Sequence, residues 1–157
     1  MRDVVKSGVS FGLSSGVITT LGLLVGLWAS TDNKLVVIGG VLMIAIADSF
    51  SDALGIHLSK ESIKGNNKKY IWDATISTFF TKFFIASSFL ALLFLFDLRM
   101  AIIVSVIYGF VLIGIFSWWL AKERGEPVWK GMLEHLFIGF VVVVITYVVG
   151  HFVGRFF

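Results

Sequence analysis

Five apolar segments, each long enough to cross a lipid bilayer, constrain this chain more than any other feature. A helix needs about 20 predominantly apolar residues to cross the hydrocarbon core. The segments cover residues 4–28, 35–58, 72–96, 100–121 and 131–154, and the breaks between them are short and polar or charged. Unbroken apolar runs such as residues 141–145 lack the alternation of a membrane β-barrel. We therefore predict an all-α membrane protein with five transmembrane helices, in which residues 1–157 form a single membrane domain.

The composition agrees with a membrane protein and excludes several functions. Of the 157 residues, 57% are hydrophobic and only 15% are charged, whereas soluble domains carry about 25% charged residues. The chain has no cysteine, which excludes disulfides, thiolate metal sites and thiol catalysis. It also lacks the H-E-x-x-H and G-x-S-x-G motifs of hydrolases, so we do not expect an enzyme. We expect the lipid bilayer, and not nucleic acid, to be its main surroundings.

The basic residues are distributed unevenly between the two ends of the helices, which predicts an orientation. Nine lie on one side and three on the other. The richer side holds Arg2, Lys6, Lys60, Lys64, Lys68, Lys69, Lys122, Arg124 and Lys130, and the poorer side holds Lys34, Arg99 and Arg155. Cytoplasmic loops are enriched in lysine and arginine. We therefore predict a cytosolic N-terminus and an outer C-terminus. We also expect the chain to lie in the inner or plasma membrane of a prokaryote.

Three charged residues lie deep inside the apolar segments, away from their ends. Asp48 and Asp52 are four residues apart in the second segment, which places both carboxylates on one helix face. A charge near the bilayer centre costs roughly 2.5–3.5 kcal/mol, so each needs a partner, a cation or a proton. Lys82 in the third segment lies at a depth similar to that of Asp48, about 15 Å from the cytosolic side. Three interpretations stay open: a structural Asp48–Lys82 ion pair, a proton relay, or two neutral, hydrogen-bonded acids.

Asp52 lies one turn nearer the cytosol and is expected to be the unpaired carboxylate at the mouth of an ion path. Oxygen ligands suit Mg²⁺ and Mn²⁺ and can serve Fe²⁺. The predicted metal ligands are Asp52, Asp48, Ser15 and Ser51, and further hydroxyls are available from Ser14, Thr19 and Ser49. No resident cofactor is expected, because the metal ion would be the transported substrate.

Other polar residues lie near the predicted cytosolic boundary. Glu134 and Asp73 open the fifth and third segments, and we predict that they face a cytosolic vestibule. An acid in the first turn of a helix is also often only a match to the helix dipole. His57 is expected to be solvated at the interface, because it lies about 140° around the helix from Asp52.

Glycines recur every four residues in the first segment, at Gly8, Gly12 and Gly16 and again at Gly22 and Gly26. Small residues at this spacing let helix backbones approach closely in membranes. Two interpretations follow: a tight contact within one chain, or the seam of a homodimer.

Several of these segments, taken in order, resemble the vacuolar iron transporter family. Residues 11–26 read FGLSSGVITTLGLLVG, residues 47–62 read ADSFSDALGIHLSKES, and TYVVG at residues 146–150 is followed by Gly154. Five segments with a cytosolic N-terminus also match the family's architecture. The resemblance implies a dimeric exporter of Fe²⁺, and often Mn²⁺, that exchanges metal for protons along a path between the first two helices.

The chain departs from the family at the positions of the family's metal ligands. Ser15 stands where the family has an aspartate, Asp52 where it has a methionine, Ile56 where it has a glutamate, and Asp48 where it has a small residue. Residues 59–71 are too few for the family's cytosolic metal-binding domain, which is therefore expected to be absent. Three functions follow: a metal–proton antiporter, a transporter of another substrate or of protons alone, or a structural or regulatory membrane protein without transport.

Overall fold

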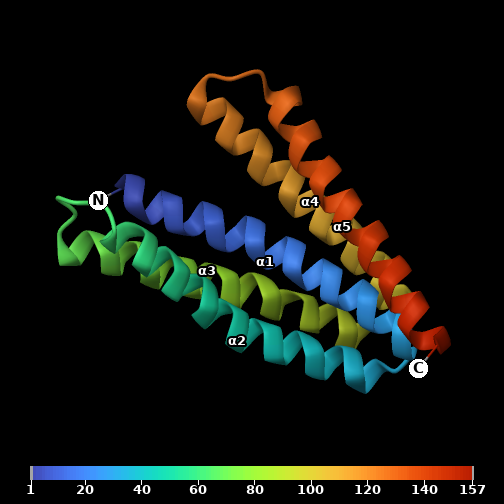
Figure 1. The fold of residues 1–157 in the computed structure, drawn as a ribbon. Helices are drawn as coiled ribbons and strands as arrows, with labels where there is room; N and C mark the ends of the chain where they lie inside the picture. The colour runs from blue at the N-terminus through green and yellow to red at the C-terminus, as the bar shows by residue number, and fades with distance from the viewer. Residues whose placement is uncertain (1, 157) are drawn as a thin grey trace. The chain divides into compact units, whose positions relative to one another are not determined.

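The computed structural model describes residues 2–156, which form five long α-helices in sequence (Figure 1). They are α1 (Arg2–Thr31), α2 (Lys34–Glu61), α3 (Lys68–Leu95), α4 (Leu98–Arg124) and α5 (Val128–Phe156). Each is long and apolar enough to cross a membrane, which confirms the predicted all-α class. The predicted spans lie inside these helices, except that α3 ends one residue before Phe96. Met1 and Phe157, the ends of the predicted domain, and the side chain of Arg2 lie outside the described residues.

Polar caps end the helices sharply and make the connections short. Asn33 accepts a hydrogen bond from the backbone N–H of Leu35 at 2.9 Å, at the start of α2. Asn67 caps α3 in the same way through the N–H of Tyr70 at 2.8 Å, and Asp97 caps α4. Such side chains satisfy backbone donors that a helix leaves unpaired at its N-terminus. Gly125 ends α4 with φ 67°, a left-handed conformation that glycine adopts without steric penalty.

The helices group into two compact units, and α1, α2 and α3 each contribute to both. Unit 1 consists of residues 1–20 and 41–90, and unit 2 consists of residues 21–40 and 91–157. One undivided membrane domain stays a prediction.

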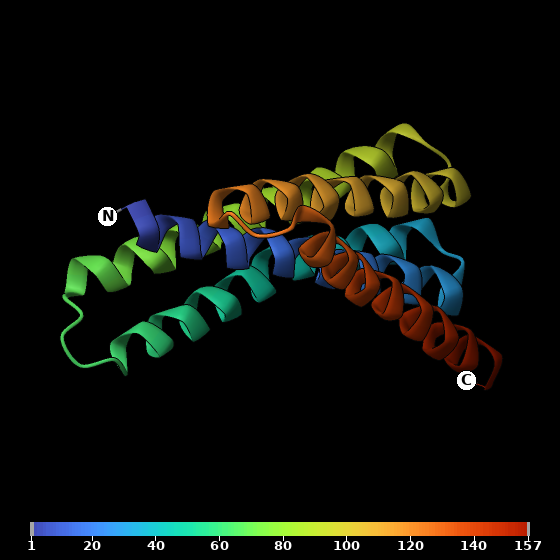
Figure 2. The same cartoon turned by 90° about the horizontal axis from the view of Figure 1, so that it is seen from above.

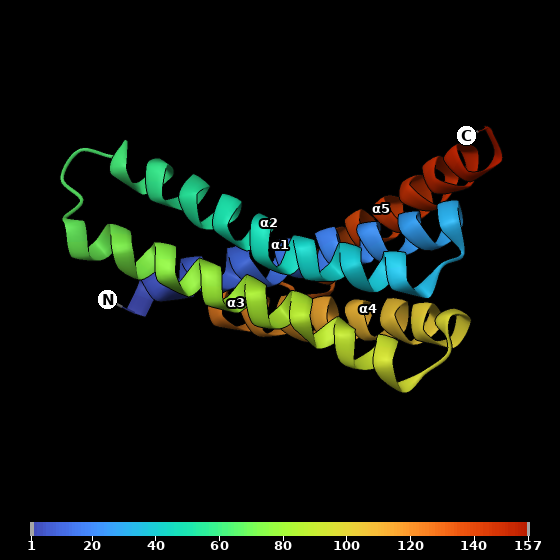
Figure 3. The same ribbon diagram turned by 90° about the horizontal axis from the view of Figure 1, so that it is seen from below.

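Close contact between α1 and α3 defines unit 1. A methyl group added at Gly12 would lie only 2.7 Å from the Thr78 carbonyl oxygen and 3.2 Å from the backbone nitrogen of Lys82. The Thr78 hydroxyl donates a hydrogen bond to the Gly8 carbonyl at 3.3 Å. Gly16 faces Ile85 one turn further along (Figure 3 shows the two helices from below). The first glycine repeat therefore forms a tight contact within the chain.

In unit 2, the α4–α5 hairpin (Figure 2) and the second half of α1 pack through small residues. A methyl group at Gly22 would contact Val142 of α5 at 3.1 Å, and one at Gly154 would lie 2.5 Å from the Ser30 carbonyl oxygen. A methyl group added at Gly150 would lie closer still to the Gly26 carbonyl oxygen. The second glycine repeat is thus also explained within the chain, and the predicted homodimer stays a prediction.

The outer surfaces of the helices are strongly apolar. Only 11% of the most apolar window of α5 is buried, against 50% in α1, and large hydrophobic side chains are exposed along every helix. Soluble monomers rarely expose apolar patches of this extent. These are the features of a multi-pass membrane protein whose helices contact lipid.

Candidate functional site

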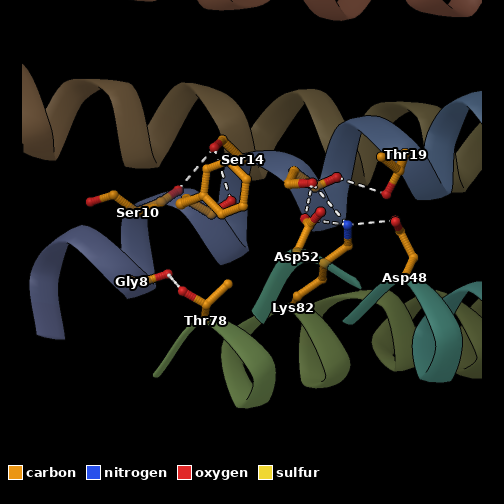
Figure 4. A network of polar contacts seen from close by, with 10 residues as sticks. Gly8, Ser10, Ser14, Thr19, Asp48, Asp52, Thr78 and Lys82 are labelled. Atoms are coloured by element: carbon orange, nitrogen blue, oxygen red, sulfur yellow. Dashed lines mark hydrogen bonds and ion pairs between the residues drawn. The ribbon is translucent and has the colours of Figure 1, made fainter. Parts of the chain in front are cut away.

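Lys82 is the centre of the candidate site, which lies wholly within unit 1. Its side chain on α3 is only 1% exposed, and it is the largest of the fully buried side chains. The Nζ atom lies 2.5 Å from Oδ2 of Asp48 and 2.5 Å from Oδ2 of Asp52, both on α2. It also donates a hydrogen bond of 2.9 Å to the Ser15 hydroxyl on α1 (Figure 4). Three helices therefore meet around one ammonium group.

Local helix geometry explains how these groups come together. Asp48 and Asp52 are one turn apart, so both carboxylates point from the same face of α2. Gly12 and Gly16 let the backbone of α1 approach that of α3 at Lys82 itself. This close approach brings Ser15, on the same stretch of α1, within reach of the ammonium.

The two aspartates are held differently. Oδ2 of Asp52 accepts hydrogen bonds from the Ser15 hydroxyl at 2.6 Å and from Lys82. Ser15 thus uses both roles of a hydroxyl, donating to Asp52 and accepting from Lys82. Oδ2 of Asp48 lies at ion-pair distance from Lys82, yet it has no aligned hydrogen-bond partner. Asp48 is therefore held by charge alone, whereas Asp52 is also held by directed hydrogen bonds.

Asp52 is not the unpaired carboxylate that the sequence suggested, because Lys82 pairs with both acids. Depth along the helix favoured Asp48 as the partner, but the long, flexible lysine side chain reaches a second carboxylate one turn away. The cluster consequently holds two acids and one base on two helices that are otherwise apolar at this level. The side chains of Asp48 and Asp52 are 29% and 19% exposed, unlike that of Lys82, although the Oδ2 atom of Asp48 is itself buried.

Of the hydroxyls considered as ligands, only Ser15 joins the cluster through a described contact. Ser14 donates to the carbonyls of Ser10 and Phe11, and Thr19 donates to the carbonyl of Ser15. Ser51 is exposed on α2, because adjacent helix positions point about 100° apart. Ser49 is fully buried, and its hydroxyl has no hydrogen-bond partner.

The predicted vestibule residues lie in separate units. Asp73 is half-buried in the first turns of α3 in unit 1, and Glu134 is exposed on α5 in unit 2. The predicted vestibule therefore stays a prediction.

Sequence reasoning missed two polar pairs between helices. His57 is half-buried, not solvated, and its Nδ1 lies 2.9 Å from the Thr75 hydroxyl. In unit 2, Nδ1 of His135 lies 2.7 Å from the hydroxyl of Ser117, which is buried on α4. Each pair joins residues 18 positions apart on two helices, and no periodicity in the sequence indicates such a partner.

The site offers few ligands to a metal ion. Within residues 2–156, no three or more histidine, cysteine, aspartate or glutamate side chains gather in a way that could hold a metal. The two carboxylates and the Ser15 hydroxyl form a minimal oxygen site, and the cation that they hold is the Lys82 ammonium.

Comparison with known proteins adds no further constraint: no family model matches the chain, and no curated protein matches it.

Proposed function

We propose that this chain is a membrane transporter that moves a divalent metal cation, of the Fe²⁺ or Mn²⁺ kind, out of the cytosol in exchange for protons. One observation carries the proposal: the buried ammonium of Lys82 lies between two carboxylates whose side chains are partly exposed. Charged residues inside a membrane segment are rare, and they typically mark ion paths or proton relays. The resemblance to the vacuolar iron transporter family supports the same function.

Lys82 acts in this proposal as a tethered competitor for the substrate. Asp48 and Asp52 hold one cation between them, either the ammonium or a metal ion. A metal that takes both carboxylates leaves the ammonium buried without a counter-charge, which is strongly unfavourable. Loss of one proton from Lys82 removes that penalty. Reprotonation of Lys82 restores the competitor and expels the metal.

The charge balance favours exchange over simple binding. With Lys82 protonated, the two carboxylates and one ammonium carry a single net negative charge. With a divalent metal bound and Lys82 neutral, the cluster carries no net charge. Neither state carries more than one net charge. A metal ion beside a protonated Lys82 would carry a net charge of +1 and would also bring two cations together in a medium of low dielectric constant, where they repel each other strongly. Metal and proton therefore occupy the site alternately.

A static ion-pair lock is the second candidate function, and the burial of Lys82 favours it. The ammonium forms ion pairs with Asp48 and Asp52 and a hydrogen bond to Ser15, which is the arrangement expected of a contact that fixes the register of three helices. In that case the protein would carry no ion, and its role would be structural or regulatory.

Transport in proteoliposomes distinguishes the two functions. The full chain is reconstituted with Mn²⁺ outside and a pH-sensitive dye inside, and Fe²⁺, Mg²⁺ and Zn²⁺ are tested in parallel. We expect metal uptake to be matched by proton release in the wild type, and to fall at least about tenfold in Asp52→Asn, the equivalent of about 1.4 kcal/mol. Glu61→Gln removes an exposed acid from the same helix and should leave the flux unchanged.

Lys82→Gln tests the coupling itself. We expect this variant to bind Mn²⁺ at least as well as the wild type but to release no matching proton. A folded wild type that moves none of the four metals would refute the transport proposal and favour the ion-pair lock. Equal flux in Asp52→Asn and Glu61→Gln would refute the assignment of the site.

A further inference from the structure

A groove between α2 and α3 in unit 1 has one end, at His57 and Trp72, next in sequence to the lysine-rich loop region, residues 59–71. It has a volume of about 390 Å³. Its lining is almost entirely apolar and includes Phe50, Leu54, His57, Trp72, Ile76 and Phe80. From this groove and its charged end, we infer that unit 1 binds one anionic phospholipid, with an acyl chain in the groove and the phosphate on the loop lysines.

The groove has the length and chemistry of an acyl-chain site. The groove lining on α2 runs from Phe50 to His57, and Lys60 lies three residues beyond it. From Phe50 to Lys60 is ten residues, or about 15 Å along the helix. This is half of the roughly 30 Å hydrocarbon core, the depth of one lipid leaflet. Phe50 and Trp72 are 62% and 54% exposed, so the chain itself leaves the groove uncovered.

The loop-side end of the groove is built from polar and aromatic groups. His57 packs edge-on against Trp72, with ring centroids 4.9 Å apart, and is held in place by Thr75. Amphipathic rings of this kind lie at the level of lipid headgroups. The groove is therefore apolar where the acyl chain would lie and more polar where the phosphate would lie.

Charge complementarity selects an anionic lipid. The loop region, residues 59–71, carries four lysines, Lys60, Lys64, Lys68 and Lys69, with Glu61 as its one acid. Lys64 lies in the connection itself, and the other three lysines lie on the helix ends beside it. Lys64, Lys68 and Lys69 are exposed and thus free to reach a phosphate. Each lysine near a membrane surface contributes about 1 kcal/mol of attraction to anionic lipid. A zwitterionic lipid would fill the groove equally well but would gain little from these lysines.

Native mass spectrometry of the full chain, released from nanodiscs of equal phosphatidylglycerol and phosphatidylcholine, tests the inference. We expect the wild type to retain one phosphatidylglycerol with at least about tenfold preference. Lys64→Gln, Lys68→Gln and Lys69→Gln together should remove most of that preference. The matched control removes three positive charges from the α4–α5 side, through Lys122→Gln, Arg124→Gln and Lys130→Gln, and should keep the preference.

A groove variant tests the position of the acyl chain. Ile76 is half-exposed in the groove, and Ile76→Trp fills the space without disturbing a buried residue. We expect it to retain less of both lipids while its melting temperature in detergent stays close to that of the wild type. Equal retention of the two lipids by the wild type, or equal behaviour of the two triple variants, would overturn the inference. So would lipid-free dimers that Ile76→Trp converts to monomers, because a second copy would then cover the groove.

Discussion

The two units of this protein pack by the same means but differ in what they bury. In both, glycines bring helix backbones into contact: Gly12 against Thr78 in unit 1, and Gly150 against Gly26 in unit 2. Unit 2 buries only hydroxyls among its described polar side chains, at Ser105 and Ser117, whereas unit 1 also buries Lys82. Because unit 2 packs without a buried charge, close helix packing does not by itself require one in unit 1. The difference implies that the charged cluster serves a purpose beyond packing.

Lys82→Met should lower the stability of the protein more than any other substitution proposed below. It leaves Asp48 and Asp52 without their counter-charge, and breaking a buried ion pair in this way typically costs about 3–5 kcal/mol. We expect a loss of that order in the free energy of unfolding, measured by denaturant titration of the full chain in mixed micelles. Lys69→Met, at an exposed position, should change stability by less than about 0.5 kcal/mol.

Removing all the charges should reverse most of this loss. When Lys82→Met is combined with Asp48→Asn and Asp52→Asn, no unpaired charge remains, and such replacements are often close to neutral. If Lys82→Met proved as stable as Lys69→Met, the ion pairs would not hold unit 1 together, and the contrast with unit 2 would fail.

The sequence was a good guide to whatever lies along one helix. Apolar length predicted all five helices, and the four-residue spacing placed Asp48 and Asp52 on one face. Depth along the helix also indicated that Lys82 lies level with Asp48, and Nζ of Lys82 is 2.5 Å from Oδ2 of Asp48. Each of these inferences depends only on the rise and rotation per residue, which are the same in every α-helix.

Contacts between helices were less predictable, because they depend on how helices rotate and pack. The glycine spacing indicated a close contact but not its partner, which is α3 for Gly12 and α5 for Gly22. Depth alone did not show that Lys82 reaches Asp52 as well as Asp48. The pairing of His57 with Thr75 could not be predicted from the sequence, because a single histidine and a single threonine form no periodic pattern.

Alanine at a glycine contact should cause an intermediate loss of stability in either unit, but should reduce exchange only in unit 1. Gly12→Ala forces a methyl group against the Thr78 carbonyl and the Lys82 backbone, and overpacking of this kind typically costs about 1–3 kcal/mol. Because the displaced backbone carries Lys82, metal–proton exchange per folded molecule should fall as well. Gly150→Ala in unit 2 should lower stability similarly but leave exchange unchanged.

The control for both variants is Gly55→Ala on α2, where an added methyl group meets nothing within 4 Å. Replacing an unconstrained helical glycine should stabilise by up to about 1 kcal/mol. Thermal unfolding in detergent gives the stability, and flux normalised to folded protein gives the activity. Equal loss of exchange in Gly12→Ala and Gly150→Ala would mean that the function is not confined to unit 1.

The smallest expected effect tests the neutral polar pair of unit 2. Ser117→Ala removes the 2.7 Å hydrogen bond to His135 between α4 and α5, and a neutral hydrogen bond contributes about 0.5–1.5 kcal/mol to stability. We expect a loss of about 1 kcal/mol in the free energy of unfolding, less than for Gly12→Ala, with exchange per folded molecule unchanged. Ser51→Ala, at an exposed serine, controls for loss of a hydroxyl alone. Loss of exchange in a stable Ser117→Ala protein would assign a second polar group to the proposed ion path. It would also refute the proposed division into a charged unit that carries the function and an apolar unit that supports it.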